Sequence, residues 1–74
     1  MNIKIKRNNG NETIINLKEI TSVQMNANSV VELRTGQTIV GVINKDSNVS
    51  YFDGTERQVG FDYLEKFLLE HIGA

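Results

Sequence analysis

The sequence predicts an α+β fold that is mainly β: a strongly bent antiparallel sheet, or small open barrel, of five to six strands with one C-terminal helix packed on it. Three observations support this prediction. Apolar and polar residues alternate through most of residues 1–59. Turns rich in Asn and Gly separate the alternating runs. The remaining stretch, residues 61–72, changes to helical spacing.

Length and composition define the class of protein. A chain of 74 residues without cysteine or proline forms a single domain, residues 1–74, near the lower size limit for an independent core. Disulfides and cysteine-based zinc sites are excluded. The net charge of −1 gives no general attraction to nucleic acid or anionic membranes. Neither a bilayer-spanning apolar run nor a signal-peptide pattern is present, and we expect a cytoplasmic protein.

The N-terminal third has the pattern of hairpin strands. Residues 2–7 alternate, with Lys4 and Lys6 on the polar face, and predict a half-buried strand. An Asn- and Gly-rich turn follows, and residues 12–25 continue the alternation. Leu17–Ile20 fits either a bend between two strands or a bulge within one long strand.

The segment VVELRTGQTIVGVI predicts the clearest hairpin. A two-residue turn at Gly36–Gln37 would have glycine first, as a type II′ turn requires. Leu33 would then lie opposite Val40, and Val31 opposite Val42, with all four on one face. The alternative turn, one residue earlier, matches the apolar residues less well.

A second glycine, Gly41, lies inside the apolar run, where it suits a sharply bent sheet or the close approach of another element. Apolar residues and the two glycines form a spaced pattern in this hairpin: Val31, Leu33, Gly36, Ile39, Gly41 and Ile43. The pattern resembles the first motif of Sm-like proteins, whose bent antiparallel sheets often assemble into RNA-binding rings. It covers about thirteen residues, and the second motif and N-terminal helix of that family are missing. The resemblance therefore implies a bent sheet only.

The C-terminal third closes with a hairpin and a helix. Asp53–Gly54 between β-prone runs predicts a tight turn. The helix over residues 61–72 has one apolar face, a capping-box pattern at Asp62 and Glu65, and a stop at Gly73. We expect five residues to form the centre of the core: Leu33, Val40, Val42, Leu64 and Leu68.

Few residues could catalyse a reaction. His71, the single histidine, lies in the last helical turn, where the helix dipole favours it, and the carboxylates are dispersed. No metal-ligand spacing and no phosphate-binding glycine loop is present. We therefore predict a protein that is not an enzyme and has no cofactor or metal.

The composition favours a protein-protein interaction module, such as an inhibitor or accessory protein from a phage or mobile element that acts on a host protein. Alternation places Tyr51 and Phe52 on opposite faces, so one of them is expected at the surface. The predicted contact residues are Tyr51, Arg57 and Arg34, because aromatic and arginine side chains dominate interfaces. A small chain with apolar residues on two strand faces is also expected to form a homo-oligomer, a dimer through a strand edge or the back of the central hairpin.

The alternative function is a small nucleic-acid-binding barrel. Its contacts would be Lys4, Lys6 and Arg7 on the N-terminal basic strand, because phosphate binding needs clustered cations. A solvated strand face, with lysines that protect an edge from aggregation, explains the same residues.

Overall fold

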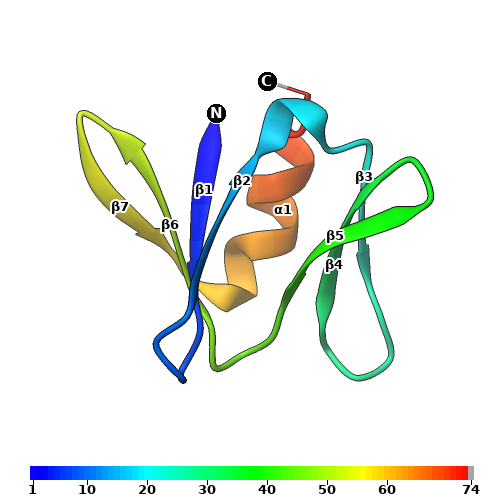
Figure 1. Cartoon of the computed structure of the whole chain (residues 1–74), viewed down its shortest axis with the longest axis horizontal. Coiled ribbons are helices and arrows are strands. Elements are labelled where there is room, and N and C mark those ends of the chain that lie inside the picture. Colours follow the sequence, from blue (N-terminus) through cyan, green and yellow to red (C-terminus); the bar gives the residue numbers. More distant parts are fainter. Residues whose placement is uncertain (74) are drawn as a thin grey trace.

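The computed structural model describes residues 1–73, which form seven strands, a 3-10 helix and an α-helix. The elements follow in chain order: β1 (Asn2–Lys6), β2 (Glu12–Asn16), η1 (Leu17–Glu19), β3 (Ser22–Met25), β4 (Val31–Thr35), β5 (Thr38–Ile43), β6 (Asn48–Asp53), β7 (Thr55–Val59) and α1 (Phe61–His71). The predicted fold class is confirmed: mainly β, antiparallel, with one C-terminal helix (Figure 1).

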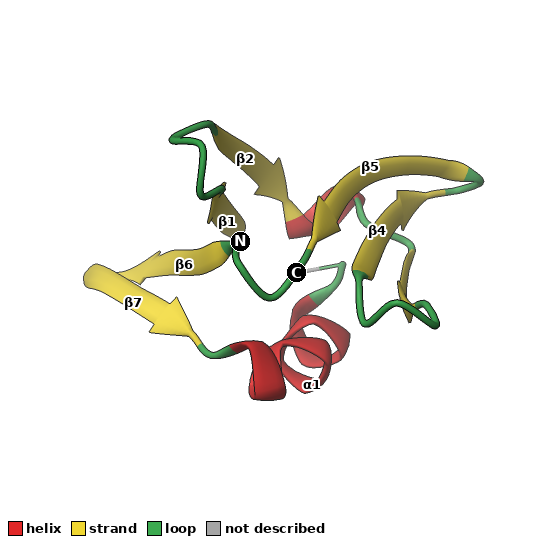
Figure 2. Ribbon diagram, turned by 90° about the horizontal axis from the view of Figure 1, so that it is seen from below, coloured by secondary structure: helices red, strands yellow, loops and turns green. Residues whose placement is uncertain are grey.

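The strands form two sheets, of order β2-β1-β6-β7 and β3-β4-β5, and every neighbouring pair is antiparallel. Figure 2 shows α1 on one side of the molecule and strands β2 and β5 on the other. These two strands are edges of different sheets, and no ladder of hydrogen bonds joins them within residues 1–73. The two sheets therefore form no closed barrel within residues 1–73, and β2 and β5 flank an opening between them.

Residues Leu17–Ile20 form a bend, which resolves the alternative that the sequence left open. The Asn16 side chain accepts a hydrogen bond from the backbone N–H of Lys18, and the Ile20 N–H donates to the Leu17 carbonyl. Leu17 itself is buried. The bend separates β2 from β3, which lie in different sheets, and it raises the number of strands above the expected five to six.

The β4–β5 hairpin has the predicted turn but a different register beyond it. Thr35 and Thr38 flank the turn, and Gly36 has a φ of 62°. A β-bulge next to Leu33 then adds one residue to β5, so Leu33 lies opposite Gly41. The predicted pairing of Leu33 with Val40 is wrong for this reason.

The same bulge corrects the predicted core. Val31 pairs with Ile43, which replaces Val42 as its partner. Because side chains alternate between faces, one extra residue turns Val40 and Val42 outward, and each is 42% exposed. The prediction that Val40 and Val42 are buried is therefore wrong, and Ile43 takes a core position.

Gly41 is buried for a packing reason. A Cβ atom at this position would lie 2.5 Å from Cδ1 of Ile15 and 3.4 Å from Cδ1 of Leu33. The expectation that the missing side chain lets another element pack closely is confirmed, and that element is β2.

The core joins both sheets and the helix. Leu33, Leu64 and Leu68 are fully buried, as predicted. They belong to one cluster: Ile3, Ile5, Ile15, Leu17, Ile20, Val31, Leu33, Ile43, Val49, Leu64, Phe67 and Leu68. The helix stops before Gly73, as expected. Its N-cap is Gly60 without a side-chain hydrogen bond, so the predicted capping box does not form.

Candidate functional site

Nine large apolar side chains of residues 1–73 are exposed. They are Met1, Ile14, Met25, Ile39, Val40, Val42, Phe52, Tyr63 and Leu69. Phe52 and Ile14 are the most exposed of these, at 71% and 69%. Single exposed apolar residues are ordinary, whereas contiguous ones mark binding surfaces. The arrangement of this set therefore matters more than its size.

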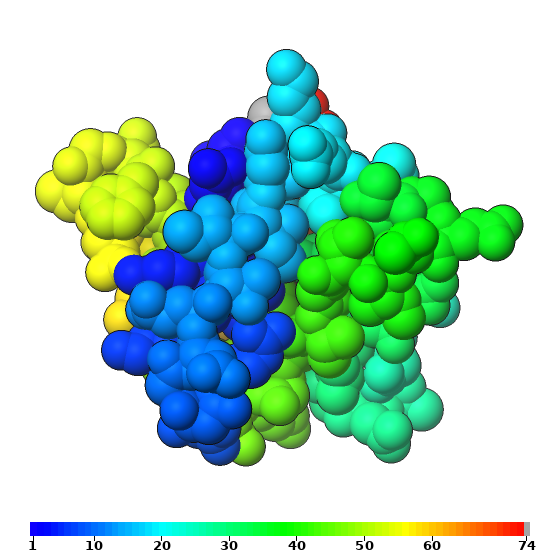
Figure 3. Space-filling model, viewed as in Figure 1, coloured from blue at the N-terminus to red at the C-terminus, as the bar shows by residue number. Residues whose placement is uncertain are grey.

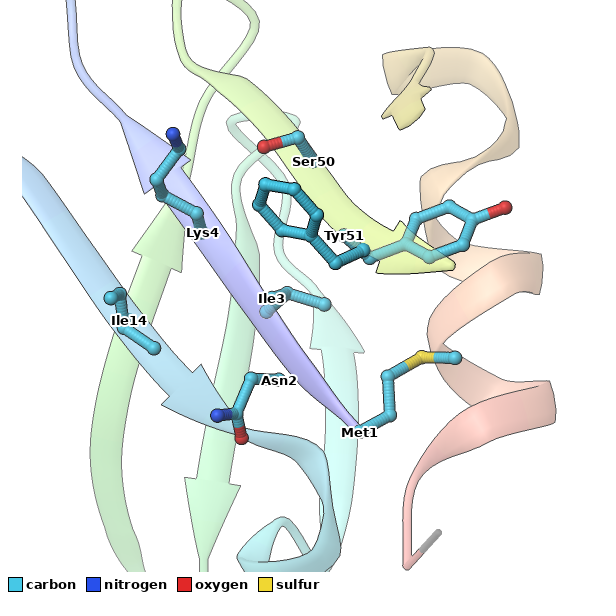
Figure 4. A pocket seen from close by; sticks show the side chains of 8 residues that line it. Met1, Asn2, Ile3, Lys4, Ile14, Ser50 and Tyr51 are labelled. Carbon is cyan, nitrogen blue, oxygen red and sulfur yellow. The ribbon is translucent and has the colours of Figure 1, made fainter. Parts of the chain in front are cut away.

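A hollow of about 360 Å³ has both Phe52 and Ile14 in its lining. Figure 4 shows Ile14, Lys4 and Tyr51 around it. Three strands, β1, β2 and β6, supply its lining: Met1, Asn2, Ile3, Lys4, Ile14, Ser50, Tyr51 and Phe52. We call it the outer hollow. The sheet register explains its construction, because Lys4 lies opposite both Ile14 in β2 and Ser50 in β6. These three side chains thus form a row across the outer face of the four-stranded sheet.

The charge at the outer hollow is balanced by neighbouring residues. Lys4 Nζ lies 2.9 Å from Glu56 Oε2 and 3.8 Å from Glu12 Oε2. The Ser50 hydroxyl donates to Glu56 Oε2 at 3.3 Å. The hydrogen bond from Lys4 lowers the pKa of Glu56, and the same bond raises the pKa of Lys4. The amine and the carboxylates thus satisfy each other at the edge of an apolar hollow.

A second depression lies toward the opening between the two sheets, and its lining is mixed and largely polar. Its lining comes from β2, β5 and the bend between β2 and β3: Thr13, Ile14, Ile15, Asn16, Glu19, Ile20, Thr35 and Val40. Ile14 lines both depressions. Phe52, Ile14 and Val40 are thus exposed apolar side chains on β6, β2 and β5, with Lys4 of β1 between the first two. We call this set the apolar stripe. Figure 3 views this face, with β2 near its middle, β5 on one side and the β6–β7 hairpin on the other.

The predicted basic strand lies among carboxylates. Lys4 and Lys6 share the outer face of β1, but Lys4 contacts Glu56 and Lys6 lies opposite Glu12 in the register. Arg7 Nη1 donates a hydrogen bond to the Thr13 hydroxyl at 2.8 Å. The outer face of β1 therefore has mixed charge.

The three predicted protein contacts fall in two places. Tyr51 and Arg57 lie opposite each other in the β6–β7 pair. Tyr51 is half-buried, with its ring centroid 4.9 Å from that of Phe67, and it lines the outer hollow. Arg34 lies in the other sheet, where its Nη2 atom is 3.0 Å from Glu32 Oε1. The structure thus brings Tyr51 and Arg57 together and leaves Arg34 apart.

Sequence reasoning missed Ile14 and left Phe52 unassigned. Of the two adjacent aromatic residues, Phe52 is the exposed one, which agrees with the expectation that one of the pair faces outward. Ile14 carried a usable signal, because it is the apolar residue out of phase with the alternation in β2.

His71 has structural contacts. Its Nδ1 atom lies 2.8 Å from the Phe67 carbonyl oxygen, and its ring stacks on that of Phe67 at 4.4 Å. In the described part of the chain, no three histidine or carboxylate side chains gather as metal ligands. None of the helices in residues 1–73 has the length and apolar character to cross a bilayer.

Fold and surface together define a small, mainly β domain with an apolar stripe beside an opening between two sheets. Comparison of the chain with protein-family models, curated proteins and solved structures found no match.

Proposed function

We propose that the protein is a non-enzymatic protein-protein interaction module that binds its partner through the apolar stripe. The outer hollow carries this proposal, because the two most exposed apolar side chains, Phe52 and Ile14, both line it. An apolar anchor side chain of a partner would fill the hollow and remove these residues from water. Such buried anchors at the centre of an interface supply most of its binding energy.

The ion pairs around the hollow favour an uncharged anchor side chain on the partner. Lys4 already has two carboxylate partners, so a phosphate or carboxylate ligand would have to displace Glu56 or Glu12. A nucleic acid would meet the same competition along β1, where Lys6 lies opposite Glu12. Protein binding is therefore favoured over the alternative of a nucleic-acid-binding barrel.

We propose that the protein is an inhibitor or accessory protein of a phage or mobile element. It would use this surface to act on a host protein in the cytoplasm. The small size and asparagine-rich composition of the chain support such an origin. Within this role, Tyr51 remains a contact residue because it lines the hollow. Arg57 lies beside it across the β6–β7 pair and would contact the rim of the partner.

Affinity capture from the host, compared between variants, tests the proposal. Phe52→Ala and Ile14→Ala should each weaken binding of the captured protein by about 2 kcal/mol or more, which is roughly 30-fold in affinity. Tyr63→Ala and Leu69→Ala remove exposed side chains from α1 and serve as matched controls that retain binding.

Salt dependence separates the two functions. Binding through the apolar stripe should change little between about 50 and 200 mM salt, whereas binding through several phosphates should lose orders of magnitude. Steeply salt-dependent binding of DNA or RNA, abolished in a Lys4→Ala, Lys6→Ala double variant and retained in Phe52→Ala, would replace the proposal with the nucleic-acid function.

A further inference from the structure

We infer that a second copy of this chain occupies the outer hollow, and that Phe52 of each copy covers the hollow of the other. This inference rests on the proposed function, since it concerns the same surface: the second copy covers the hollow until a host protein displaces it. It is carried by a projecting aromatic side chain, an apolar hollow beside it and a balanced set of charges.

Phe52 is suited to insertion into another molecule. It lies in β6, one residue before Asp53 and the Gly54 turn, on a hairpin that projects from the body of the molecule (Figure 1). At 71% exposure, it is the most exposed large apolar side chain of residues 1–73. Insertion of this ring into an apolar hollow would remove much of its surface from water.

The position of the hollow determines the symmetry of the complex. Phe52 projects from the rim of the same hollow that would receive the Phe52 ring of a second copy. A two-fold axis at that rim therefore satisfies both contacts at once. A projection and a hollow on opposite sides of a molecule would instead join copies head to tail in an open chain. The observed adjacency gives a closed dimer.

Charge permits this face to meet a copy of itself. A two-fold interface places each charged group near its own equivalent, which is unfavourable for unpaired charges. Here Lys4 lies between Glu56 and Glu12, and Lys6 lies opposite Glu12, so two cations and two carboxylates are balanced before association. Ser50, the remaining polar side chain of the row, already donates its hydroxyl hydrogen to Glu56.

The face is also large enough. The two longer extents of the molecule are 31 and 26 Å, and Figure 3 views the face that they define. A stable interface needs about 800 Å² from each partner. An interface of that size would take up most of this broad face, Ile14 included.

Sedimentation of three proteins tests the dimer over about 1 µM to 1 mM, the range in which a dimer of moderate affinity dissociates. We expect the wild-type chain and Leu69→Asp to be dimers, and Phe52→Asp to remain a monomer because it places a charge in the hollow. Circular dichroism of each variant verifies folding. A wild-type monomer throughout this range, or a folded Phe52→Asp that dimerises like the wild type, would overturn the inference.

A fluorescent reporter locates the interface, because the chain has no tryptophan. The emission of Phe52→Trp should shift to shorter wavelength as concentration rises and the ring leaves water. The emission of Tyr63→Trp, on α1, should stay constant over the same range. A shift in the helix reporter alone would place the dimer on another face and would overturn the inference.

The outcomes for the dimer and for the proposed function are separable. A monomeric wild-type chain whose captured host protein is still lost in Phe52→Ala would overturn the dimer and leave the proposed function in place. A dimer that dissociates in Phe52→Asp, without any host protein whose capture depends on Phe52, would support the dimer and count against a host partner.

Discussion

The Cδ1 atom of Ile15 occupies the space in which a side chain at Gly41 would begin. A Cβ atom on Gly41 would lie 2.5 Å from it, closer than real Cβ contacts allow. Ile15 belongs to β2 and Gly41 to β5, the two edge strands on either side of the opening between the sheets. Side-chain packing between these edges, rather than a ladder of hydrogen bonds, thus brings the two sheets together.

Gly41→Ala should therefore destabilise the fold by about 1 kcal/mol, because the new methyl group has to displace the Cδ1 end of the Ile15 side chain. Ile15→Val removes the opposing Cδ1 atom and should cost about 0.5–1.5 kcal/mol alone. The double variant should be more stable than the sum of the two costs predicts, as measured by chemical denaturation. Strictly additive costs would show that the two side chains do not compete for space.

Two adjacent leucines test how the helix docks. Leu68 is fully buried in the core, whereas Leu69 is 55% exposed. Leu68→Ala should reduce the free energy of unfolding by about 2–5 kcal/mol, since it leaves a cavity. Leu69→Ala makes the same chemical change at the surface and should stay within about 0.5 kcal/mol of the wild type. Equal effects of the two substitutions would mean that α1 does not pack on the sheets through Leu68.

The β-bulge marks the limit of what alternation alone can predict. Strand positions, turns and the helix follow from local patterns, and the structure bears out the bent, open architecture that they imply. The register of β5 does not follow, because Val40, Val42 and Ile43 are all β-branched or aliphatic and suit either face. In the observed register, Gly41 packs against Ile15, a residue that is remote in sequence. A single-sequence pattern does not contain that contact.

Threonine substitutions distinguish the two registers. Val→Thr keeps the shape of the side chain and adds a hydroxyl group. Val31→Thr should cost about 1–3 kcal/mol, since Val31 is fully buried and the hydroxyl would have to leave water. Val42→Thr should change stability by less than about 0.5 kcal/mol because the side chain is exposed. A large cost at Val42, measured by denaturation, would favour the register without a bulge.

The site was less predictable than the fold. Tyr51, chosen from sequence, does line the outer hollow, but the exposed aromatic side chain is its neighbour Phe52. Alternation shows that the two face opposite sides, and the position of α1, whose Phe67 packs on Tyr51, determines which side is inside. Ile14 joins the site because β1 lies between β2 and β6. That strand order is a long-range property of the fold.

The Lys4–Glu56 pair predicts a pH dependence of stability. The pKa of Glu56 is lowered from its ordinary value of 4.5, chiefly by the Lys4 hydrogen bond, so its contribution is present above 4.5 and is lost as pH falls below it. The pKa of Lys4 is raised from 10.5, so the same contact is lost as pH rises beyond 10.5. Thermal unfolding measured from below pH 4.5 to above pH 10.5 should show that stability falls at both extremes.

Glu56→Gln provides the control for this pH dependence. This variant should lose less stability than the wild type at both acidic and alkaline pH. A smaller loss of stability should remain at acidic pH because of Glu32, whose pKa is lowered by the Arg34 hydrogen bond. Identical pH profiles for Glu56→Gln and the wild type would show that the Lys4–Glu56 contact does not form in solution.

The hydrogen bond from the Gly73 N–H to the Leu17 carbonyl, 2.8 Å long, has a consequence for biosynthesis. β1 pairs with β6, and the bend after β2 forms a hydrogen bond with the residue after the helix. The N-terminal strands therefore cannot complete their contacts until the C-terminal segments have been synthesised. Contacts between residues so far apart in sequence slow folding. On the ribosome, β1 and β2 would emerge with an apolar face that has no cover until residues 61–73 are made. Nascent chains are then most exposed to aggregation and to chaperone binding.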